Sequence, residues 1–244
     1  MKKKLIFIIG TILIIIITIL LLWYNGVIIF NYPSEKRYEV RGVDVSSYQG
    51  DINWNVLAKQ GISFAFIKAT EGSSFLDEKF KENYENAIKT DLKIGVYHFF
   101  SFDSNGNTQA DNFIKNVPKK DDMLPPVVDI EFYDDKYKNV PDIEETQKQL
   151  QILLDRLEEY YGKKAIIYET YKSYNLYIMN NFKDNYIWIR DVFFRPSLRD
   201  NRDWTFWQYT DKVKLDGYNG KESKIDMNVF NGNSEEFRKI FNIE

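Results

Sequence analysis

The chain has 244 residues, among them 33 basic and 36 acidic side chains, one histidine and no cysteine. Without cysteine it can form neither a disulfide framework nor a thiolate site, and a single histidine gives poor support to a zinc centre or a catalytic triad. When the lysines at positions 2–4 are set aside, 30 basic residues stand against 36 acidic ones. This balance argues against a nucleic acid as the partner, because nucleic-acid binding calls for a basic surface.

Residues 5–30 form the most apolar stretch of the chain. Residues 5–22 are 18 consecutive uncharged residues, mostly isoleucine and leucine, which is long enough to cross a bilayer. Three lysines precede them and the next basic residue is Lys36, so the positive-inside rule predicts a cytoplasmic tip at 1–4 and an extracellular remainder. We therefore predict a single-pass signal-anchor in the cell membrane at 5–30. The alternative is a cleaved signal and a secreted protein.

A polar segment at 31–40 predicts a short stalk, and 41–244 is long enough for one well-buried domain. Eight runs rich in β-branched and aromatic residues predict strands, at 41–50, 64–70, 94–100, 124–132, 165–168, 186–190, 204–209 and 225–230. Helical periodicity follows only the first five, at 54–61, 77–89, 107–116, 142–161 and 174–180. This alternation of strands and helices along the chain predicts an α/β fold. We expect an irregular TIM-like (β/α) barrel with eight parallel strands and fewer than eight helices.

The fourth predicted strand ends in two acids, Asp129 and Glu131. Because side chains alternate along a strand, both carboxyl groups fall on one face, and acids rarely lie on a buried strand unless they are paired or used. In such a barrel the chemistry lies where the strands end, and Asp44 and Asp226 are expected there too. Like charges gathered at one mouth raise at least one pKa, and a carboxyl group that stays protonated near neutral pH can act as a general acid.

Aromatic side chains are expected around the same mouth. The candidates for substrate binding are Tyr48, Glu71, Tyr97, Phe99, Tyr168, Trp188, Trp207 and Tyr209. An acidic cleft with aromatic walls suits a carbohydrate polymer, because rings stack on sugars and acids protonate glycosidic oxygens. Plainer interpretations stay open: a lone aspartate can serve a turn, Glu71 can pair with Lys68, and most aromatics serve a core. An oxygen-only site for Ca²⁺ or Mg²⁺ also stays open, although we predict no metal and no cofactor.

Eight short motifs in order resemble glycoside hydrolase family 25, the Chalaropsis-type lysozymes or N-acetylmuramidases. They are Gly42–Gly50, Phe66–Gly72, Gly95–Phe100, Asp129–Glu131, Ile167–Tyr168, Trp188–Ile189, Phe206–Tyr209 and Ile225–Phe230, and they span about 41–232. The resemblance implies an irregular barrel short of helices. It also implies hydrolysis of the β-1,4 bond between N-acetylmuramic acid and N-acetylglucosamine in peptidoglycan.

The resemblance also implies roles for the four acids. Glu131 takes the role of general acid, and Asp129 orients the substrate's N-acetyl group or stabilises the cation. Asp44 and Asp226 complete the acidic cleft. The partner that the resemblance implies is the glycan strands of peptidoglycan, and the apolar stretch 5–30 predicts the bacterial membrane as a second partner.

The chain departs from the family's pattern at two places. Glu169 stands where a small hydroxyl residue is usual, and Arg190-Asp191 replace a small residue and an aromatic. Arg190 brings a cation near the cleft. A catalytically silent glycan-binding module on the same barrel is the alternative function, and the intact pair of Asp129 and Glu131 argues against it. A metal-dependent hydrolase is a third hypothesis, which insensitivity to EDTA would remove.

Overall fold

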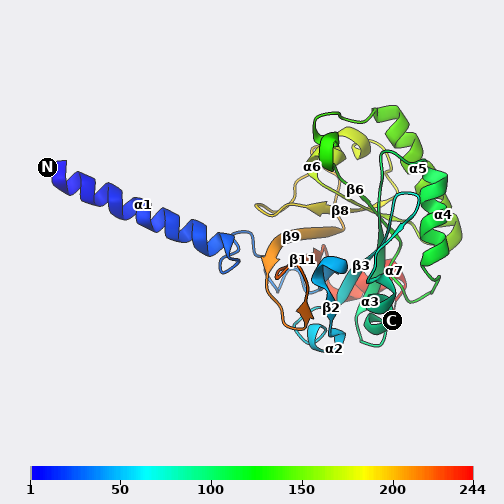
Figure 1. Ribbon diagram of the computed structural model, residues 1–244, viewed down its shortest axis with the longest axis horizontal. Helices are drawn as coiled ribbons and strands as arrows, with labels where there is room; N and C mark the ends of the chain where they lie inside the picture. The colour runs from blue at the N-terminus through cyan, green and yellow to red at the C-terminus, as the bar shows by residue number, and fades with distance from the viewer. Residues whose placement is uncertain (1, 244) are drawn as a thin grey trace.

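A computed structural model describes residues 2–243, and Figure 1 shows a barrel from which one long helix projects. This helix, α1 (Lys2–Tyr24), has no buried residue. Within the described range it is the one helix long and apolar enough to cross a membrane, a test that membrane anchors and secretion signals both pass. An apolar helix is therefore confirmed within the predicted stretch 5–30, but it ends at Tyr24, and Ile29 beyond it packs against the outer layer of the barrel.

Eight strands close into a barrel, as the sequence predicts. In chain order they are β1 (Arg41–Val45), β3 (Phe64–Glu71), β5 (Lys93–Phe99), β6 (Val127–Ile130), β7 (Ile166–Glu169), β8 (Tyr186–Arg190), β9 (Phe206–Val213) and β11 (Ile225–Phe230). Each pairs with the next, and β11 pairs with β1 to close the ring. The short β4 (Phe75–Leu76) pairs antiparallel with the end of β3, while β2 (Asp51–Ile52) and β10 (Tyr218–Asn219) form a separate pair.

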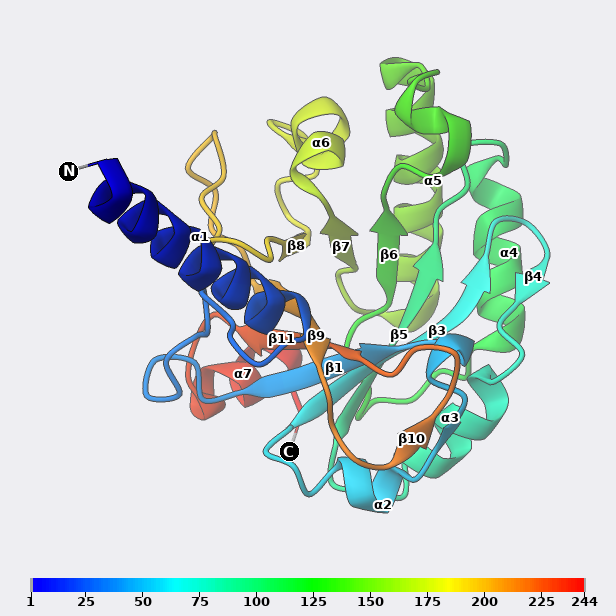
Figure 2. The same cartoon turned by 60° about the vertical axis from the view of Figure 1, so that its left-hand side comes forward.

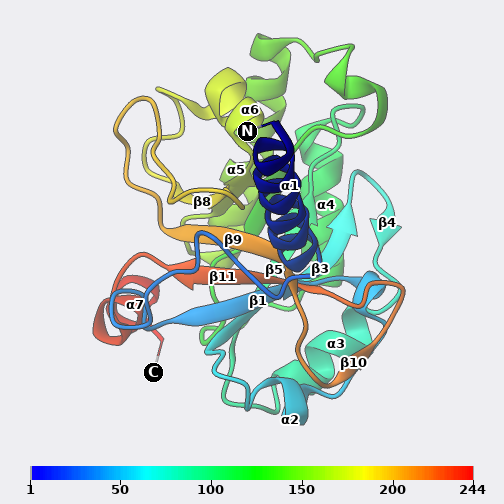
Figure 3. The same cartoon turned by 90° about the vertical axis from the view of Figure 1, so that its left-hand side faces the viewer.

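The last barrel strand runs against the other seven, and on this point the expectation of a parallel barrel is wrong. The strands from β1 to β9 are parallel to their neighbours, whereas β11 is antiparallel to both β9 and β1. Figure 3 shows the three strands side by side. The reason is the short 214–224 connection, which holds only β10, whereas a crossover to a parallel neighbour needs about a dozen or more residues.

Helices cover one side of the barrel. They are α2 (Trp54–Leu57), α3 (Phe80–Ala87), α4 (Gly106–Asn116), α5 (Ile143–Tyr161) and α6 (Tyr171–Ser173), with the short helical turns η1 (Ser47–Gln49), η2 (Asp134–Tyr137) and η3 (Tyr174–Ile178). Figure 2 shows α3, α4 and α5 along the side of β3 to β6, while loops connect β8, β9 and β11. Asp142 caps the longest helix by accepting from the Glu145 amide, and Gly162 ends it with a φ of 72°.

A further helix, α7 (Ser234–Phe241), was not expected, because helical periodicity was identified only after the first five strands. Asn233 and Glu236 form a capping box at its start. Phe237 and Phe241 on its buried face pack against Phe206 and Phe230 inside the barrel. The helix therefore closes the end of the barrel that is opposite to the mouth described below.

Both faces of the barrel wall are buried. One cluster fills the interior with aromatic rings, and another lies between the wall and the helices. Two glycines make room for the interior rings: a Cβ on Gly42 or on Gly95 would lie 2.4 Å from the ring of Phe64 or Phe66, respectively. Alternate residues of each strand therefore face either the aromatic interior or the outer layer.

The segment 31–40 lies against the barrel. Asn31 donates hydrogen bonds to the carbonyl oxygens of Asp191 and Tyr209, at 3.1 and 3.0 Å. Tyr38 is buried in the outer layer, and the guanidinium of Arg41 donates to the Pro33 carbonyl. These contacts tie the residues that follow α1 to the barrel wall.

Candidate active site

The four acids predicted from the sequence meet at one end of the barrel. Asp44 is the fourth residue of β1, Asp129 is the third of β6, and Glu131 directly follows β6. Asp226 is only the second residue of β11, yet the reversed direction of that strand brings its beginning to the end where β1 finishes. Asp226 lies directly opposite Asp44 in the register of the two strands.

Two amide side chains from neighbouring strands hold Asp44. Gln208 Nε2 donates to its two carboxylate oxygens at 3.2 and 3.0 Å, and Asn228 Nδ2 donates at 2.7 Å. Each amide is fixed in turn, since the Tyr168 hydroxyl donates to Gln208 Oε1 at 2.9 Å and Trp188 Nε1 donates to Asn228 Oδ1 at 2.8 Å. With their oxygens occupied, both amides must present NH₂ groups to Asp44, which favours its ionised form.

Asp44 and Asp226 form a buried pair with unequal surroundings. Burial raises the pKa of Asp44, but the hydrogen bonds from Asn228 and Gln208 oppose the rise. Burial raises the pKa of Asp226 well above its ordinary value, and the charge of Asp44 adds to this effect. The two amide donors therefore favour the negative charge on Asp44 over Asp226.

Asp129 and Glu131 form the second pair of acids. Asp129 is buried, and its Oδ1 has no hydrogen-bond partner in the described chain. Burial raises the pKa of Asp129 well above its ordinary value, and the charge of Glu131 adds to the shift. Burial also raises the pKa of Glu131, against the opposing charge of Arg190. The mouth can therefore hold protonated carboxyl groups at a pH where exposed acids are ionised.

Two cavities of about 360 and 620 Å³ open over the mouth and meet at three acids. Glu131, Asp226 and Glu222 line both of them. Asp44 and Asp129 line only the smaller cavity, whereas Arg190 lines only the larger. A polymer that filled both halves of this cleft would place a central bond beside Glu131.

Five of the predicted binding residues line the cleft. Tyr48, Glu71, Tyr97 and Phe99 line the smaller cavity, and Tyr168 lines the larger one. Glu71 also accepts from Lys68 Nζ at 2.9 Å, and the same ammonium lies 4.9 Å from the centre of the Phe99 ring. Glu71 is thus a cleft residue and an ion-pair partner at once.

The other three predicted binding residues do not line these cavities. Trp188 is buried below the mouth, stacked on Phe66 with 4.5 Å between ring centres. Trp207 and Tyr209 lie in the outer layer of the wall, where Trp207 Nε1 donates to the Asp191 carbonyl at 2.7 Å. Both belong to the opposite strand face from Gln208, which points into the barrel.

The sequence candidates omitted residues that the structure brings to the mouth. Gln208 and Asn228 orient Asp44, and Glu222 lines the cleft, whereas Arg190, which the sequence already placed near the cleft, lines its larger half. A usable signal existed for Asn228, which follows Asp226 at the same two-residue spacing as Asp129 and Glu131. Glu222 lies on a polar connection, where no pattern distinguishes it from other surface acids.

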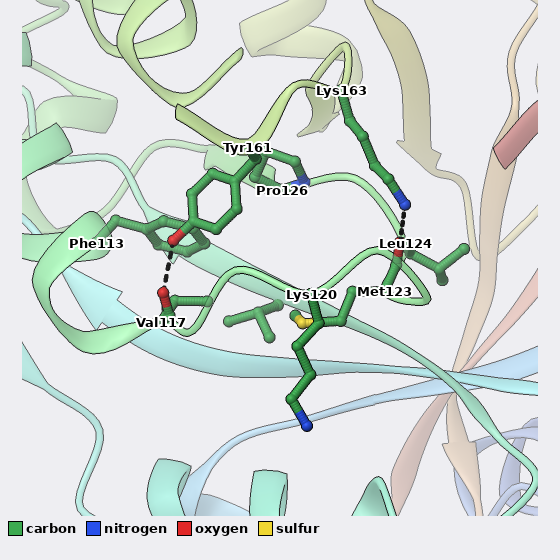
Figure 4. A pocket seen from close by; sticks show the side chains of 9 residues that line it. Phe113, Val117, Lys120, Met123, Leu124, Pro126, Tyr161 and Lys163 are labelled. Carbon is green, nitrogen blue, oxygen red and sulfur yellow. Dashed lines mark hydrogen bonds between the residues drawn. The ribbon is translucent and has the colours of Figure 1, made fainter. Parts of the chain in front are cut away.

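A small cavity lies away from the mouth, between the C-terminal ends of α4 and α5 and the chain that leads into β6 (Figure 4). Phe113, Val117, Met123 and Tyr161 line it, and its volume of about 10 Å³ is close to that of a single water site. It contains no acid. Among residues 2–243, no group of three or more histidine, aspartate or glutamate side chains is placed to hold a metal ion.

Comparisons with known proteins agree with this geometry. The family model described as glycosyl hydrolases family 25 matches residues 43–218, a range that includes Asp44, Asp129 and Glu131. Lysozyme M1 of Streptomyces globisporus is 32% identical over 214 residues, which cover 83% of this chain and 71% of that protein.

Solved structures give the same likeness. A family 25 glycosyl hydrolase from Bacillus anthracis is 55% identical, with a TM-score of 0.81 over 87% of this chain and 97% of that one. A bacterial lysozyme from Streptomyces coelicolor is 30% identical, with a TM-score of 0.74 over 83% of this chain and 97% of that one. Both likenesses extend over most of the barrel.

Proposed function

Because the chain belongs to glycosyl hydrolase family 25 and is therefore a glycosidase, we propose that it is a muramidase that cleaves peptidoglycan. The bond would be the β-1,4 link between N-acetylmuramic acid and N-acetylglucosamine. The observation that carries the proposal is the place of Glu131, a carboxyl group with a raised pKa at the junction of the two halves of the cleft.

In this proposal Glu131 is the general acid. It donates its proton to the glycosidic oxygen while the bond from that oxygen to the anomeric carbon breaks. Water then adds its hydroxyl to the anomeric carbon and returns a proton to the Glu131 carboxylate. Burial supports this role because it keeps Glu131 protonated to a higher pH than an exposed glutamate.

Asp129 is proposed to bind the N-acetyl group of the sugar at the breaking bond. Asp129 lines the smaller half of the cleft, where its carboxyl group can accept the N–H of the substrate's acetamido group. The ionised Asp44, held by Gln208 and Asn228, adds negative potential beneath a developing sugar cation. Tyr48, Tyr97 and Phe99 offer ring faces or a hydroxyl to the neighbouring sugars.

Mass spectrometry of digested peptidoglycan tests the proposed bond. Purified cell-wall sacculi are incubated with the protein, and the reducing ends of the fragments are reduced and identified. Muramic acid at each new reducing end is the expected result. Glucosamine there would assign a different bond, and an absence of fragments would favour a glycan-binding module. A parallel digest in the presence of EDTA is expected to give the same fragments.

We further propose that the protein is anchored by residues 5–30, with 1–4 in the cytoplasm, 31–40 joining the anchor to the barrel, and 41–244 as the extracellular hydrolase domain. The support is the length of α1 and the three lysines that precede its apolar core. Such an anchor would keep the cleft close to the inner surface of the wall.

A further inference from the structure

Two adjacent phenylalanines are exposed on the loop between β8 and β9. The exposed fraction is 56% for Phe193 and 75% for Phe194. Figure 2 shows this loop rising beside α1. Neighbouring aromatic side chains of this size are normally buried, and a contiguous exposed apolar patch marks a contact with a partner or a membrane.

The loop that carries them is held in place by Asp191. Its carboxylate Oδ1 accepts from the backbone N–H groups of Phe193 and Phe194, at 2.9 and 2.8 Å. Its carbonyl oxygen accepts from Trp207 Nε1 and from Asn31 Nδ2, at 2.7 and 3.1 Å. The exposure of the two rings is therefore built into the turn, and the same residue fastens the turn to the segment that follows α1.

Phe193 lies against the aromatic residues at the C-terminal end of α1. Trp23 stacks on Phe193 with 5.8 Å between ring centres. Two cations lie beside them: Lys212 Nζ is 3.5 Å from the centre of the Trp23 ring, and Lys224 Nζ donates to the Tyr24 carbonyl at 2.7 Å. Aromatic rings with lysines at the end of an apolar helix are the composition of a membrane–water interface.

We propose that the loop 191–195 is a second membrane contact, in which Phe193 and Phe194 enter the headgroup region of the bilayer that α1 crosses. Arg195 would face lipid phosphates from the same loop, together with Lys212 and Lys224. This inference rests on the proposed anchoring through α1. It adds that the barrel is held at the membrane at two points, with one orientation, instead of swinging on a single tether.

Lipid is the occupant that these observations favour over a second protein. The patch is continuous with an apolar helix that has no buried residue, and Lys212 and Lys224 beside it are cations that match anionic lipid headgroups. An interfacial loop also needs only shallow burial, which two phenylalanines at a turn can provide.

The absence of cysteine makes a direct test available, since one introduced thiol carries the only label. The full-length chain is reconstituted in phosphatidylglycerol–phosphatidylcholine vesicles as three separate variants, each bearing an environment-sensitive fluorophore: Phe194→Cys, Ile14→Cys within α1, and Phe75→Cys. Phe75 is a matched control, because it is 50% exposed and lies on β4, on the far side of the barrel from α1 in Figure 2. Brominated lipids then quench any label that touches the bilayer.

The expected result is strong quenching at positions 14 and 194 and none at 75. Quenching at 14 alone would overturn the loop contact while leaving the anchor in place, and a blue-shifted but unquenched label at 194 would assign the patch to a protein. An absence of quenching at all three would refute the anchor itself. Quenching at all three would show a barrel lying unselectively on lipid. Each labelled variant must hydrolyse solubilised wall fragments at the wild-type rate, which verifies that its barrel is folded.

Discussion

The acids at the mouth differ in the hydrogen bonds that their carboxyl groups receive. Asp44 accepts from two oriented amides, whereas Asp129 Oδ1 accepts from none in the described chain. A carboxylate supplied with donors is stabilised in its charged form, while one without donors stays protonated or waits for a ligand. The surroundings thus favour the charged form of Asp44 and the protonated form of Asp129.

Replacing Glu131, the proposed general acid, should nearly abolish lysis while leaving the fold intact. Glu131→Gln keeps the size and polarity of the side chain but cannot donate the proton, so we expect the rate of wall hydrolysis to fall by about 10²–10⁴-fold. Turbidity of wall suspensions gives the rate, and circular dichroism verifies the fold. Glu222→Gln, which removes another acid from the same cleft, should lower the rate by less than about tenfold. Near wild-type activity of Glu131→Gln would refute the assignment.

The pH dependence of hydrolysis should respond to Arg190. The Arg190 charge lowers the pKa of Glu131, so its removal favours the protonated acid. Activity needs that proton and is lost as pH rises through the pKa of Glu131. Arg190→Gln should therefore move the alkaline limb of the kcat/KM profile to higher pH. Lys172→Gln, which replaces a cation that does not line the cleft, should leave the limb where it is. A limb that does not move, or moves down, would show that another group controls it.

At the scale of single elements, β7 carries an acid that its position does not explain. Glu169 is fully buried on the outer face of the strand, neither of its carboxyl oxygens has a partner in the described chain, and burial raises its pKa well above the ordinary value. The folded protein therefore keeps a proton that the unfolded chain releases. Stability is fully present below the ordinary glutamate pKa and falls as pH rises toward the pKa of the folded state.

Glu169→Gln should remove that pH dependence. A group protonated only in the folded state changes the free energy of unfolding by about 1.4 kcal/mol per pH unit. Urea denaturation between pH 5 and 7 should thus show a shallower loss of stability in the variant than in the wild type. Parallel curves for the two proteins would mean that Glu169 is ionised in the folded state. Glu159→Gln, at an exposed position of α5, serves as the control.

The lack of space around the glycines inside the barrel predicts that a larger residue there lowers the stability of the protein. Gly95→Ala puts a Cβ against the Phe66 ring, and overpacking of this kind costs about 1–3 kcal/mol. The midpoint of urea denaturation should fall accordingly. The double variant with Phe66→Leu should recover part of the loss, because the smaller side chain leaves room for the new methyl group. Equal losses with and without Phe66→Leu would place the strain elsewhere.

Strand composition was the strongest predictor of the fold, and its limits explain what the sequence did not reveal. It located all eight barrel strands, and with them the acids at 44, 129 and 131. It cannot give strand direction, because a run of β-branched and aromatic residues reads alike in both senses, so the reversed direction of β11 was missed. Nor can it tell the inner face from the outer one here, because both faces of the wall are buried. The sequence analysis therefore assigned Trp207 and Tyr209, which lie in the outer layer, to the mouth that Gln208 faces.

At the scale of the whole molecule, the anchor predicts where the protein is found. The full-length chain should sediment with membranes, resist extraction by high salt and dissolve in detergent. Placing two arginines at the helix centre, Ile14→Arg with Ile15→Arg, costs about 2.5–3.5 kcal/mol for each charge. The double variant should therefore either leave the membrane or fail to insert into it. Full-length protein free in the medium would contradict anchoring, and a mature N-terminus beyond Tyr24 would identify a cleaved signal.

The hydrogen bonds around Asp44 join the two ends of the barrel seam. Its partners Gln208 and Asn228 lie 164 and 184 residues further along the chain. A ribosome that has made the first six strands has therefore made the acids at 44, 129 and 131 without the groups that orient Asp44. The four acids and the two amides that orient Asp44 come together only when β9 and β11 have been synthesised and the seam has closed. We therefore expect an unfinished chain to lack hydrolytic activity.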